Sequence, residues 1–323
     1  METFKIYLAP MLDVTTPQFR KFIRHLNKDV ILFTEMIVAE TVIHVSDEKL
    51  TQILGEYEEN TIVQIGGCDP YSISRAIRKI NEVTKFDQFN LNCGCPSSRV
   101  QKGNFGACLM LQPETIIKII NTVYEETGFV LSLKIRIGVD EFDSYDFFKD
   151  FISSIVSNTK CDTFFVHARK CWLNGLSPSQ NRTIPPIRYD FVHRIKEEFP
   201  KQKFILNGAI NNVFQLQTKG NLDGFMIGRA AIKNPFIFCE FTQKLNEKYT
   251  EIEKHTTLLL NYFLLYNQNE IVKHIHIFPV LNFFHGKPGN KKYKNFITET
   301  ARKKITFGDY IIKLEEFLVN FNF

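Results

Sequence analysis

Residues 90–97 read Asn-Leu-Asn-Cys-Gly-Cys-Pro-Ser, close a short apolar run and open a glycine-containing loop that extends to residue 106. Two amides, two thiols and a Gly-Cys-Pro turn are poor material for a protein core, because buried polar groups without partners are unfavourable. A strand that ends at a ligand site explains this composition. Two ordinary buried thiols are the alternative interpretation of Cys93 and Cys95.

Seven more apolar runs occur along the chain, separated by segments long enough for helices. Together with the run over residues 86–91 that leads into this motif, the eight runs occupy residues 4–9, 30–33, 61–65, 86–91, 130–135, 163–166, 203–206 and 224–227. They contain few polar residues, as parallel strands covered on both faces do, and they predict a closed (β/α)8 TIM barrel of the α/β class. A doubly wound open sheet is the alternative. Pro17, Pro70 and Pro113 stand where helices of such a barrel would begin.

The pattern changes after about Lys244. Helical periodicity without strands covers residues 256–266, 271–284 and 310–321. The sequence therefore predicts two domains, a barrel over residues 1–244 and a small all-helical domain over residues 245–323.

Positive charge is concentrated in the predicted helical domain. The chain carries a net charge of +5, and residues 273–304 hold eight Lys or Arg against one acid, Glu299. Tyr293 and Phe296 lie among these cations, a pattern typical of a surface that contacts a phosphate backbone. A solvated helix face is the alternative.

Composition argues against several other classes of protein. The 323 residues are 44% hydrophobic and 23% charged, which is typical of a folded globular chain. The seven cysteines are an odd number without paired zinc-ligand spacing, which argues against a disulfide framework and a metal site and favours a reducing, cytoplasmic compartment. No apolar run approaches the roughly 18 residues that span a bilayer, so we expect no membrane-embedded segment.

Small residues follow the seventh and eighth predicted strands, at the end of the barrel where such enzymes hold their active sites. Asn207-Gly208-Ala209 and Gly228 would let main-chain N–H groups approach a phosphate, and Arg229 could pair with it. The sequence thus predicts a phosphorylated cofactor. Simple turns at Gly208 and Gly228 are the alternative.

Six motifs together resemble the tRNA-dihydrouridine synthases. They are Ala9-Pro10-Met11, residues 90–97, residues 99–107, Lys134-Ile135-Arg136, His167-Ala168-Arg169 and Gly228-Arg229. The resemblance covers nearly the whole chain. Residues 171–178, followed by Asn181-Arg182 and residues 184–186, resemble the bacterial A branch of that family.

This resemblance implies a flavin enzyme that modifies RNA. It implies an FMN-binding barrel with a C-terminal RNA-binding domain, which reduces the C5–C6 double bond of uridine in the D-loop of tRNA with electrons from NADPH. The A branch acts around positions 20 and 20a. Hydride would pass from flavin N5 to C6, and Cys95 resembles the residue that gives the proton to C5. Cys93 is then a packed neighbour, and we expect a monomer.

The same resemblance assigns the remaining site residues. Those expected at the flavin ring or its phosphate are Pro10, Met11, Leu12, Gln64, Lys134, His167, Asn207, Gly208, Ala209, Gly228 and Arg229. Those expected at the substrate are Asn92, Arg136, Asn181, Arg182, Lys291, Lys294 and Arg302, with His167 also resembling a residue at the uracil edge. A cation at the flavin ring suits Lys134, because reduced flavin carries negative charge near N1. A structural ion pair is the alternative for this lysine.

Two other functions fit part of the sequence. An FMN barrel oxidoreductase that acts on a free pyrimidine, similar to dihydroorotate dehydrogenase, would share the phosphate site and the thiol but has no reason for a basic helical domain. A non-catalytic RNA-binding barrel would keep the basic domain but could lose Cys95, Lys134 or His167, and all three are present.

Overall fold

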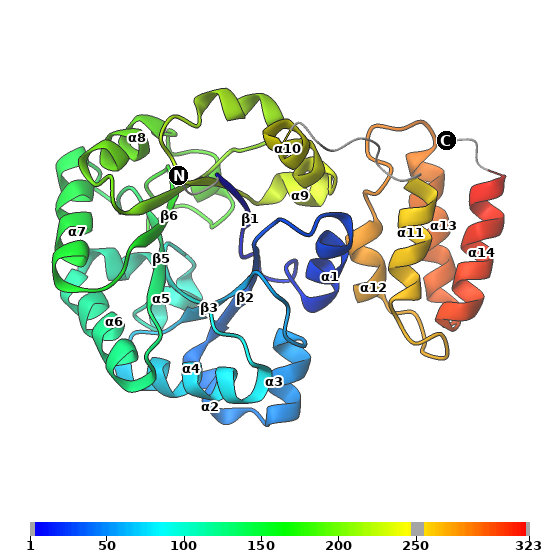
Figure 1. Ribbon diagram of the computed structural model, residues 1–323, viewed down its shortest axis with the longest axis horizontal. Coiled ribbons are helices and arrows are strands. Elements are labelled where there is room, and N and C mark those ends of the chain that lie inside the picture. Colours follow the sequence, from blue (N-terminus) through cyan, green and yellow to red (C-terminus); the bar gives the residue numbers. More distant parts are fainter. Residues whose placement is uncertain (1–3, 247–254, 321–323) are drawn as a thin grey trace. The chain divides into compact units, whose positions relative to one another are not determined.

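The eight predicted strands all form in the computed structural model of the protein, which describes residues 4–246 and 255–320 (Figure 1). They are β1 (Lys5–Leu8), β2 (Leu32–Val38), β3 (Thr61–Gly66), β4 (Phe89–Cys93), β5 (Leu131–Arg136), β6 (Thr163–His167), β7 (Lys203–Asn207) and β8 (Gly224–Ile227). All pair in parallel, in the order β1-β8-β7-β6-β5-β4-β3-β2. A doubly wound sheet would reverse its strand order part-way, and this sheet does not.

Hydrogen bonds close the sheet beside its first strand. Tyr7 forms a parallel bridge with Ile31, the residue directly before β2. Ile31 N donates to Ile6 O at 3.0 Å, and Leu8 N donates to Ile31 O at 2.9 Å. The predicted TIM barrel is therefore confirmed, and the open-sheet alternative is wrong.

Helices wrap the outside of the strands in the first of two compact units, which comprises residues 1–16, 31–210 and 215–228 (Figure 1). The helices and 3-10 helices (η) between β2 and β8 are α2 (Ala39–His44), α3 (Asp47–Leu54), α4 (Pro70–Thr84), α5 (Ser98–Lys102), η1 (Gly106–Leu111), α6 (Pro113–Thr127), α7 (Tyr145–Asn158), η2 (Gln180–Arg182), α8 (Tyr189–Glu198) and η3 (Val213–Thr218). The predicted helix starts at Pro70 and Pro113 are confirmed. Proline suits this position because the first-turn N–H groups have no partner within the helix.

The second compact unit comprises residues 17–30, 211–214 and 229–323. Its helices are α1 (Pro17–Leu26), α9 (Arg229–Lys233), α10 (Ile237–Asn246), α11 (His255–Leu264), α12 (His274–Ile277), η4 (Phe278–Val280), α13 (Asn290–Arg302) and α14 (Phe307–Val319). The start at Pro17 is confirmed. This division differs from the predicted boundary at residue 244, because α1, α9 and α10 group with the later helices. The assignment of functions to residues 1–244 and 245–323 stays a prediction.

One predicted helix of the second unit is interrupted. Helical periodicity covers residues 271–284, and the structure has the short α12 followed by η4 within this range. Pro279 explains the change, since proline removes a backbone donor and its ring clashes with the preceding turn of an α-helix. The predicted helix over 310–321 corresponds to α14, and residue 321 lies outside the described residues.

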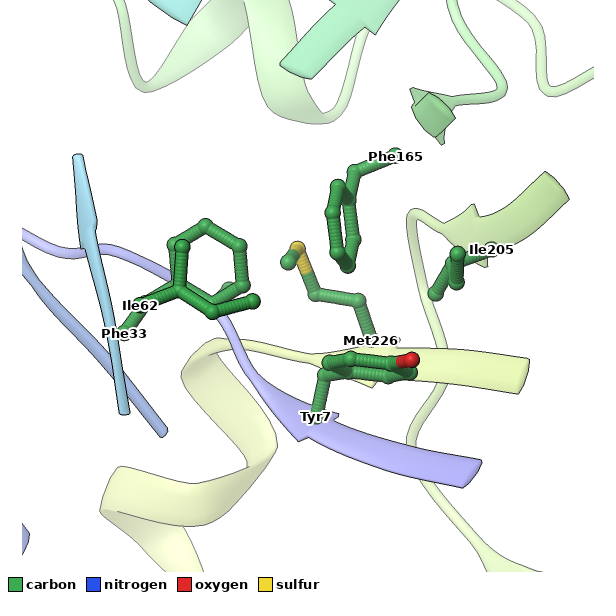
Figure 2. Packing of buried hydrophobic residues seen from close by; sticks show 7 residues of the cluster. Tyr7, Phe33, Ile62, Phe165, Ile205 and Met226 are labelled. Carbon is green, nitrogen blue, oxygen red and sulfur yellow. The ribbon is translucent and has the colours of Figure 1, made fainter. Parts of the chain in front are cut away.

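Apolar side chains fill part of the barrel interior (Figure 2). The ring of Phe165 on β6 makes edge contacts with Tyr7 and Phe33, at centroid distances of 5.0 and 4.9 Å. The full cluster consists of Tyr7, Ala9, Phe33, Ile62, Phe165, Ile205 and Met226. Side chains from six strands therefore form a packed core within the barrel.

The interior becomes polar towards the carboxyl ends of the strands. Residues two positions apart on a strand point to the same face, so the next inward positions after the apolar cluster can be read from the sequence. They include Gln64 after Ile62, His167 after Phe165, Asn207 after Ile205 and Gly228 after Met226. Strand register adds Asn92 opposite Lys134 and Arg136 opposite His167. The fold thus collects polar groups at the end of the barrel where active sites form.

Candidate active site

The turn after β4 holds Cys95 in a fixed place. Asn92 Oδ1 accepts hydrogen bonds from Gly94 N at 3.2 Å and Cys95 N at 3.1 Å. Ala107 N donates to Cys95 O at 2.9 Å. Gly106, at φ +76°, permits this approach, because a Cβ there would lie 2.5 Å from Cys95 O. The peptide groups on both sides of Cys95 are therefore restrained, and the residue is partly exposed.

Asn92 belongs to a chain of buried amides. Gln64 Nε2 donates to Asn90 Oδ1, and Asn92 Nδ2 donates to Gln64 Oε1, both at 2.8 Å. Asn90 Nδ2 then donates to Ser132 Oγ at 3.0 Å. These contacts fix the orientation of Gln64 and Asn92, two predicted site residues. Asn90 was not predicted to take part, because its role depends on neighbours in other strands.

Lys134 lies beside Asn92 and Asn207 at this end of the barrel. Lys134 Nζ donates to Asn207 Oδ1 at 3.4 Å, and Asn207 Nδ2 donates to Met226 O at 2.8 Å. Burial, followed by the cations of Arg136 and Arg182, lowers the pKa of Lys134 to about 8. Within residues 4–246 and 255–320, no carboxylate forms an ion pair with this lysine. Such a cation favours an anionic ligand.

The turn after β7 forms a strained cradle. Gly208 has φ +114° and Ala209 has φ +52°. Tyr189 Oη donates to Gly208 O at 2.6 Å, and Gln215 Nε2 donates to Ala209 O at 3.0 Å. Tyr189 from α8 and Gln215 from η3 thus hold the two carbonyl groups of this turn. Ala209 in the turn has a left-handed backbone conformation, which is unfavourable for a residue other than glycine. Neither Tyr189 nor Gln215 was predicted from the sequence.

The glycines of the two predicted phosphate turns differ in what they require. A Cβ on Gly208 would lie 2.7 Å from His167 Cδ2, so this position needs glycine. A Cβ on Gly228 would lie 3.6 Å from the Cβ of Ala9, which is an ordinary contact. Arg229 follows directly as the first residue of α9 and belongs to the second compact unit.

Replacement of Gly208 by alanine is expected to weaken the binding of a phosphorylated cofactor. The clash with His167 and the φ of +114° must both be relieved by moving the turn. Strain of about 2–3 kcal/mol corresponds to roughly 100-fold weaker binding. Gly128→Ala is the matched control, because Gly128 has φ +78° with no atom within 4 Å of the added Cβ. Fluorescence titration with FMN should separate the two variants, and equal affinities would contradict the cradle assignment.

The loop after β1 lies at the same end of the barrel. Met11 N donates to Thr15 Oγ1 at 3.1 Å, and Leu12 is 68% exposed. Asp13, at φ +59°, donates its N–H to Glu35 Oε1 at 2.6 Å. Pro10, Met11 and Leu12 were predicted here, whereas the contact of Glu35 with this loop was not.

Arg136 joins two loops. Its Nε donates to Gly94 O at 2.8 Å, and its Nη1 donates to Lys170 O and Asn181 O, each at 3.0 Å. The side chain is 4% exposed. Its recorded hydrogen bonds therefore go to backbone carbonyls, and they bring the Cys95 turn and the loop after β6 together.

Asn181 also acts within its own loop. The residue is fully buried, its Oδ1 accepts from Trp172 N and its Nδ2 donates to Trp172 O, both at 2.8 Å. The neighbouring Arg182 is exposed. Of the two adjacent residues predicted to meet the substrate, Arg182 thus projects to the surface and Asn181 shapes the loop.

Three cations predicted to contact RNA lie along α13 of the second unit. Lys291, Lys294 and Arg302 share one face of this helix, since residues three and eleven positions apart nearly align. Lys291 and Arg302 are exposed. Lys294 Nζ donates to Asn282 Oδ1 at 2.6 Å, so this lysine is tied to its own unit.

The part of the chain that the structure describes contains neither a metal-binding cluster nor a membrane-spanning helix. No group of three or more His, Cys, Asp or Glu side chains there could hold a metal ion. None of its helices is long and apolar enough to cross a bilayer.

Comparison with known proteins gives one consistent family. A family model described as "Dihydrouridine synthase (Dus)" matches residues 7–321. The chain belongs to the dihydrouridine synthase family. It is therefore a flavin-dependent oxidoreductase that uses a nicotinamide-type electron donor. The motifs on which the sequence suggested this family lie at the polar end of the barrel.

Curated relatives of this dihydrouridine synthase carry a more specific name. The tRNA-dihydrouridine(20/20a) synthase of Synechocystis sp. is 37% identical over 304 residues, which cover 91% of this chain and 88% of the relative. The enzyme of the same name from Shewanella oneidensis is 36% identical, covering 93% and 89%. That from Escherichia coli is 33% identical, covering 92% and 86%.

Proposed function

We propose that this dihydrouridine synthase reduces the C5–C6 double bond of uridine in the D-loop of tRNA, at positions 20 and 20a. The names of the relatives support the substrate and the positions. The observation that carries the proposal is the partly exposed Cys95, restrained on both sides at the end of the barrel that holds Lys134 and His167.

The residues present fit FMN as the flavin. The cradle of Gly208 and Ala209 would hold the phosphate. Gln64, Lys134 and His167 would face the ring, beside Pro10, Met11 and Leu12. Asn207 and Gly228 complete this set. When bound, FMN supplies the hydride for C6 of the uracil after it has taken electrons from NADPH.

Cys95 is the acid in this proposal. Reduction of a C5–C6 double bond needs a hydride on one carbon and a proton on the other, and Cys95 would give its thiol proton to C5. Because Arg182 is exposed, it is the best candidate among these residues for direct contact with the substrate. Asn92, Arg136 and Asn181 would act mainly by holding the loops around the base. The target base must leave the RNA stack to reach this site.

The cations of α13 would contact the phosphate backbone of tRNA. We assign catalysis to residues 1–244 and RNA binding to residues 245–323, in a monomer that works in the cytoplasm. The family and the seven free cysteines support a reducing compartment.

Salt dependence tests the α13 contacts. Replacement of both Lys291 and Arg302 by methionine should lower the slope of log affinity for tRNA against log salt concentration by about two, because each lost phosphate contact releases about one counterion fewer. Lys118→Met, on the exposed face of α6, is the control and should leave the slope unchanged. An unaltered slope in the double variant would place the RNA contacts elsewhere.

Mapping the product tests the proposed function. An unmodified tRNA transcript is incubated with the protein, FMN and NADPH, and dihydrouridine is located along the RNA. We expect it at positions 20 and 20a and at no other uridine of the D-loop. Reduction of free uracil or orotate without reduction of the transcript would favour the small-molecule enzyme instead.

A further inference from the structure

The side chain of Gln101 links two loops at the catalytic end of the barrel. This residue lies on the five-residue helix α5 and is partly buried. Its Nε2 donates to Pro96 O at 2.8 Å and to Leu173 O at 2.7 Å. A glutamine amide carries two N–H donors, so both are used, one on each loop.

One end of this link is the residue next to Cys95. Pro96 follows Cys95 directly, and the hydrogen bond at its carbonyl restrains the Pro96–Ser97 peptide, one residue beyond the thiol. The peptide on the other side is restrained by Asn92 at Cys95 N. The position of the thiol therefore depends on both contacts.

The other end of the link is the loop after β6. Leu173 N donates to Asp140 Oδ1 at 2.7 Å, so the backbone of Leu173 is held at its N–H by the loop after β5 and at its carbonyl by Gln101. Residues 170–182, named here the β6 loop, contain Asn181 and the exposed Arg182.

A second side chain makes a parallel link. Arg136 donates to Gly94 O, on the other flank of Cys95, and to Lys170 O and Asn181 O in the β6 loop. Carbonyls on both flanks of Cys95 thus accept hydrogen bonds from side chains that also hold the β6 loop. Neither segment can move by itself without breaking one of these bonds.

We propose that Gln101 is a positioning residue that couples the place of the Cys95 thiol to the β6 loop. When the target base binds against the β6 loop, the Cys95 thiol is then already aligned with it. This inference rests on the proposed role of Cys95 and adds to it how the acid is aligned. Alignment of a reacting group within a few tenths of an ångström strongly affects rate.

Three variants distinguish coupling of Cys95 to the β6 loop from stabilisation of the Cys95 loop alone. Gln101→Met keeps the length and approximate volume of the side chain and removes both donors. Gln101→Lys restores donors at nearly the same reach, because an ammonium carries three N–H groups. Gln112→Met is the matched control, since Gln112 is exposed and its side chain does not cap α6.

The first readout divides the reaction into its halves in the full, flavin-loaded enzyme. For Gln101→Met we expect reduction of the flavin by NADPH within about twofold of the unaltered enzyme, and reoxidation by tRNA slower by about 10- to 100-fold. Gln101→Lys should recover part of that loss. Equal slowing of both halves, or no slowing of reoxidation, would overturn the proposal.

The second readout does not depend on RNA reduction. Hydrogen exchange of the flavin-loaded enzyme without tRNA should speed up in Gln101→Met at the amides of Cys95 and Ala107 and also at Leu173. Faster exchange confined to residues 94–107 would mean that Gln101 only braces its own loop, and the coupling would be wrong. If the unaltered enzyme does not reduce tRNA, the proposed function fails, while the exchange result still decides whether the link exists.

Discussion

Replacement of Cys95 by alanine is expected to slow reoxidation of the reduced flavin by tRNA by about 10²- to 10⁴-fold, the range that general acids contribute. Reduction by NADPH and the affinity for FMN should stay within about twofold. The backbone contacts of Cys95, from Asn92 and Ala107, do not involve the thiol, so the turn should survive the change. Rapid mixing without oxygen measures both half-reactions.

The control for this variant comes from the same loop. Cys108 is also partly exposed, and its thiol donates to Phe105 O at 3.0 Å. Cys108→Ala should reoxidise at nearly the rate of the unaltered enzyme. If Cys95→Ala did the same, the proton would have to come from another group, and the proposed role of Cys95 would be wrong.

Replacement of Lys134 by methionine is expected to slow reduction of the flavin by about 10²-fold or more. A unit charge about 4 Å from another contributes roughly 4 kcal/mol at the effective dielectric constant of a partly buried site, and the developing negative charge of the ring would lose this stabilisation. Lys118→Met is again the surface control.

The pH dependence of reduction follows from the lowered pKa of Lys134. Its value of about 8 means that the lysine is charged below that pH and neutral above it. An anionic ligand raises this pKa, so the rate of reduction should decline with pH only above about 8. The decline should be absent in Lys134→Met. A decline of equal size in that variant would assign the ionisation to another group.

The same pKa distinguishes the two interpretations of this lysine. A structural ion pair would raise the pKa of Lys134, whereas burial and the charges of Arg136 and Arg182 lower it. In the flavin-free protein, folding therefore disfavours the charged form of Lys134. The free energy of unfolding should rise as the pH increases from about 8 towards 10.5, because over this range the unfolded chain still binds a proton that the folded protein has lost. Lys134→Met should raise the melting temperature of the flavin-free protein at pH 7, and a lower melting temperature would support the ion pair.

The barrel could be predicted because its strands are apolar on both faces. Each run of branched and aromatic residues marks a strand that helices cover, and this signal is local. The weakest prediction was the second strand, expected over residues 30–33 and found at Leu32–Val38. Thr34, Glu35 and Met36 look like a strand end, but a register shift between Phe33 and Met36 lets β2 continue through them.

The sequence predicted where the candidate site residues lie in the barrel, but it did not predict which groups they contact. Strand register brings Asn92, Lys134, His167 and Asn207 to one end of the barrel, as the strand ends indicated. The sequence could not tell that the recorded hydrogen bonds of Arg136 and Asn181 go to loop backbone. Gln101 and Tyr189 were missed for the same reason, because their partners lie 72 and 19 residues away along the chain.

Reoxidation in a single turnover tests the central claim most directly. The flavin-loaded protein is reduced with NADPH without oxygen, excess donor is removed, and unmodified tRNA is added while the flavin spectrum is followed. Our account predicts that tRNA reoxidises the flavin with formation of about one dihydrouridine per flavin, and that free uridine does not. Flavin that stays reduced in the presence of tRNA, or that free uridine reoxidises equally well, would contradict it.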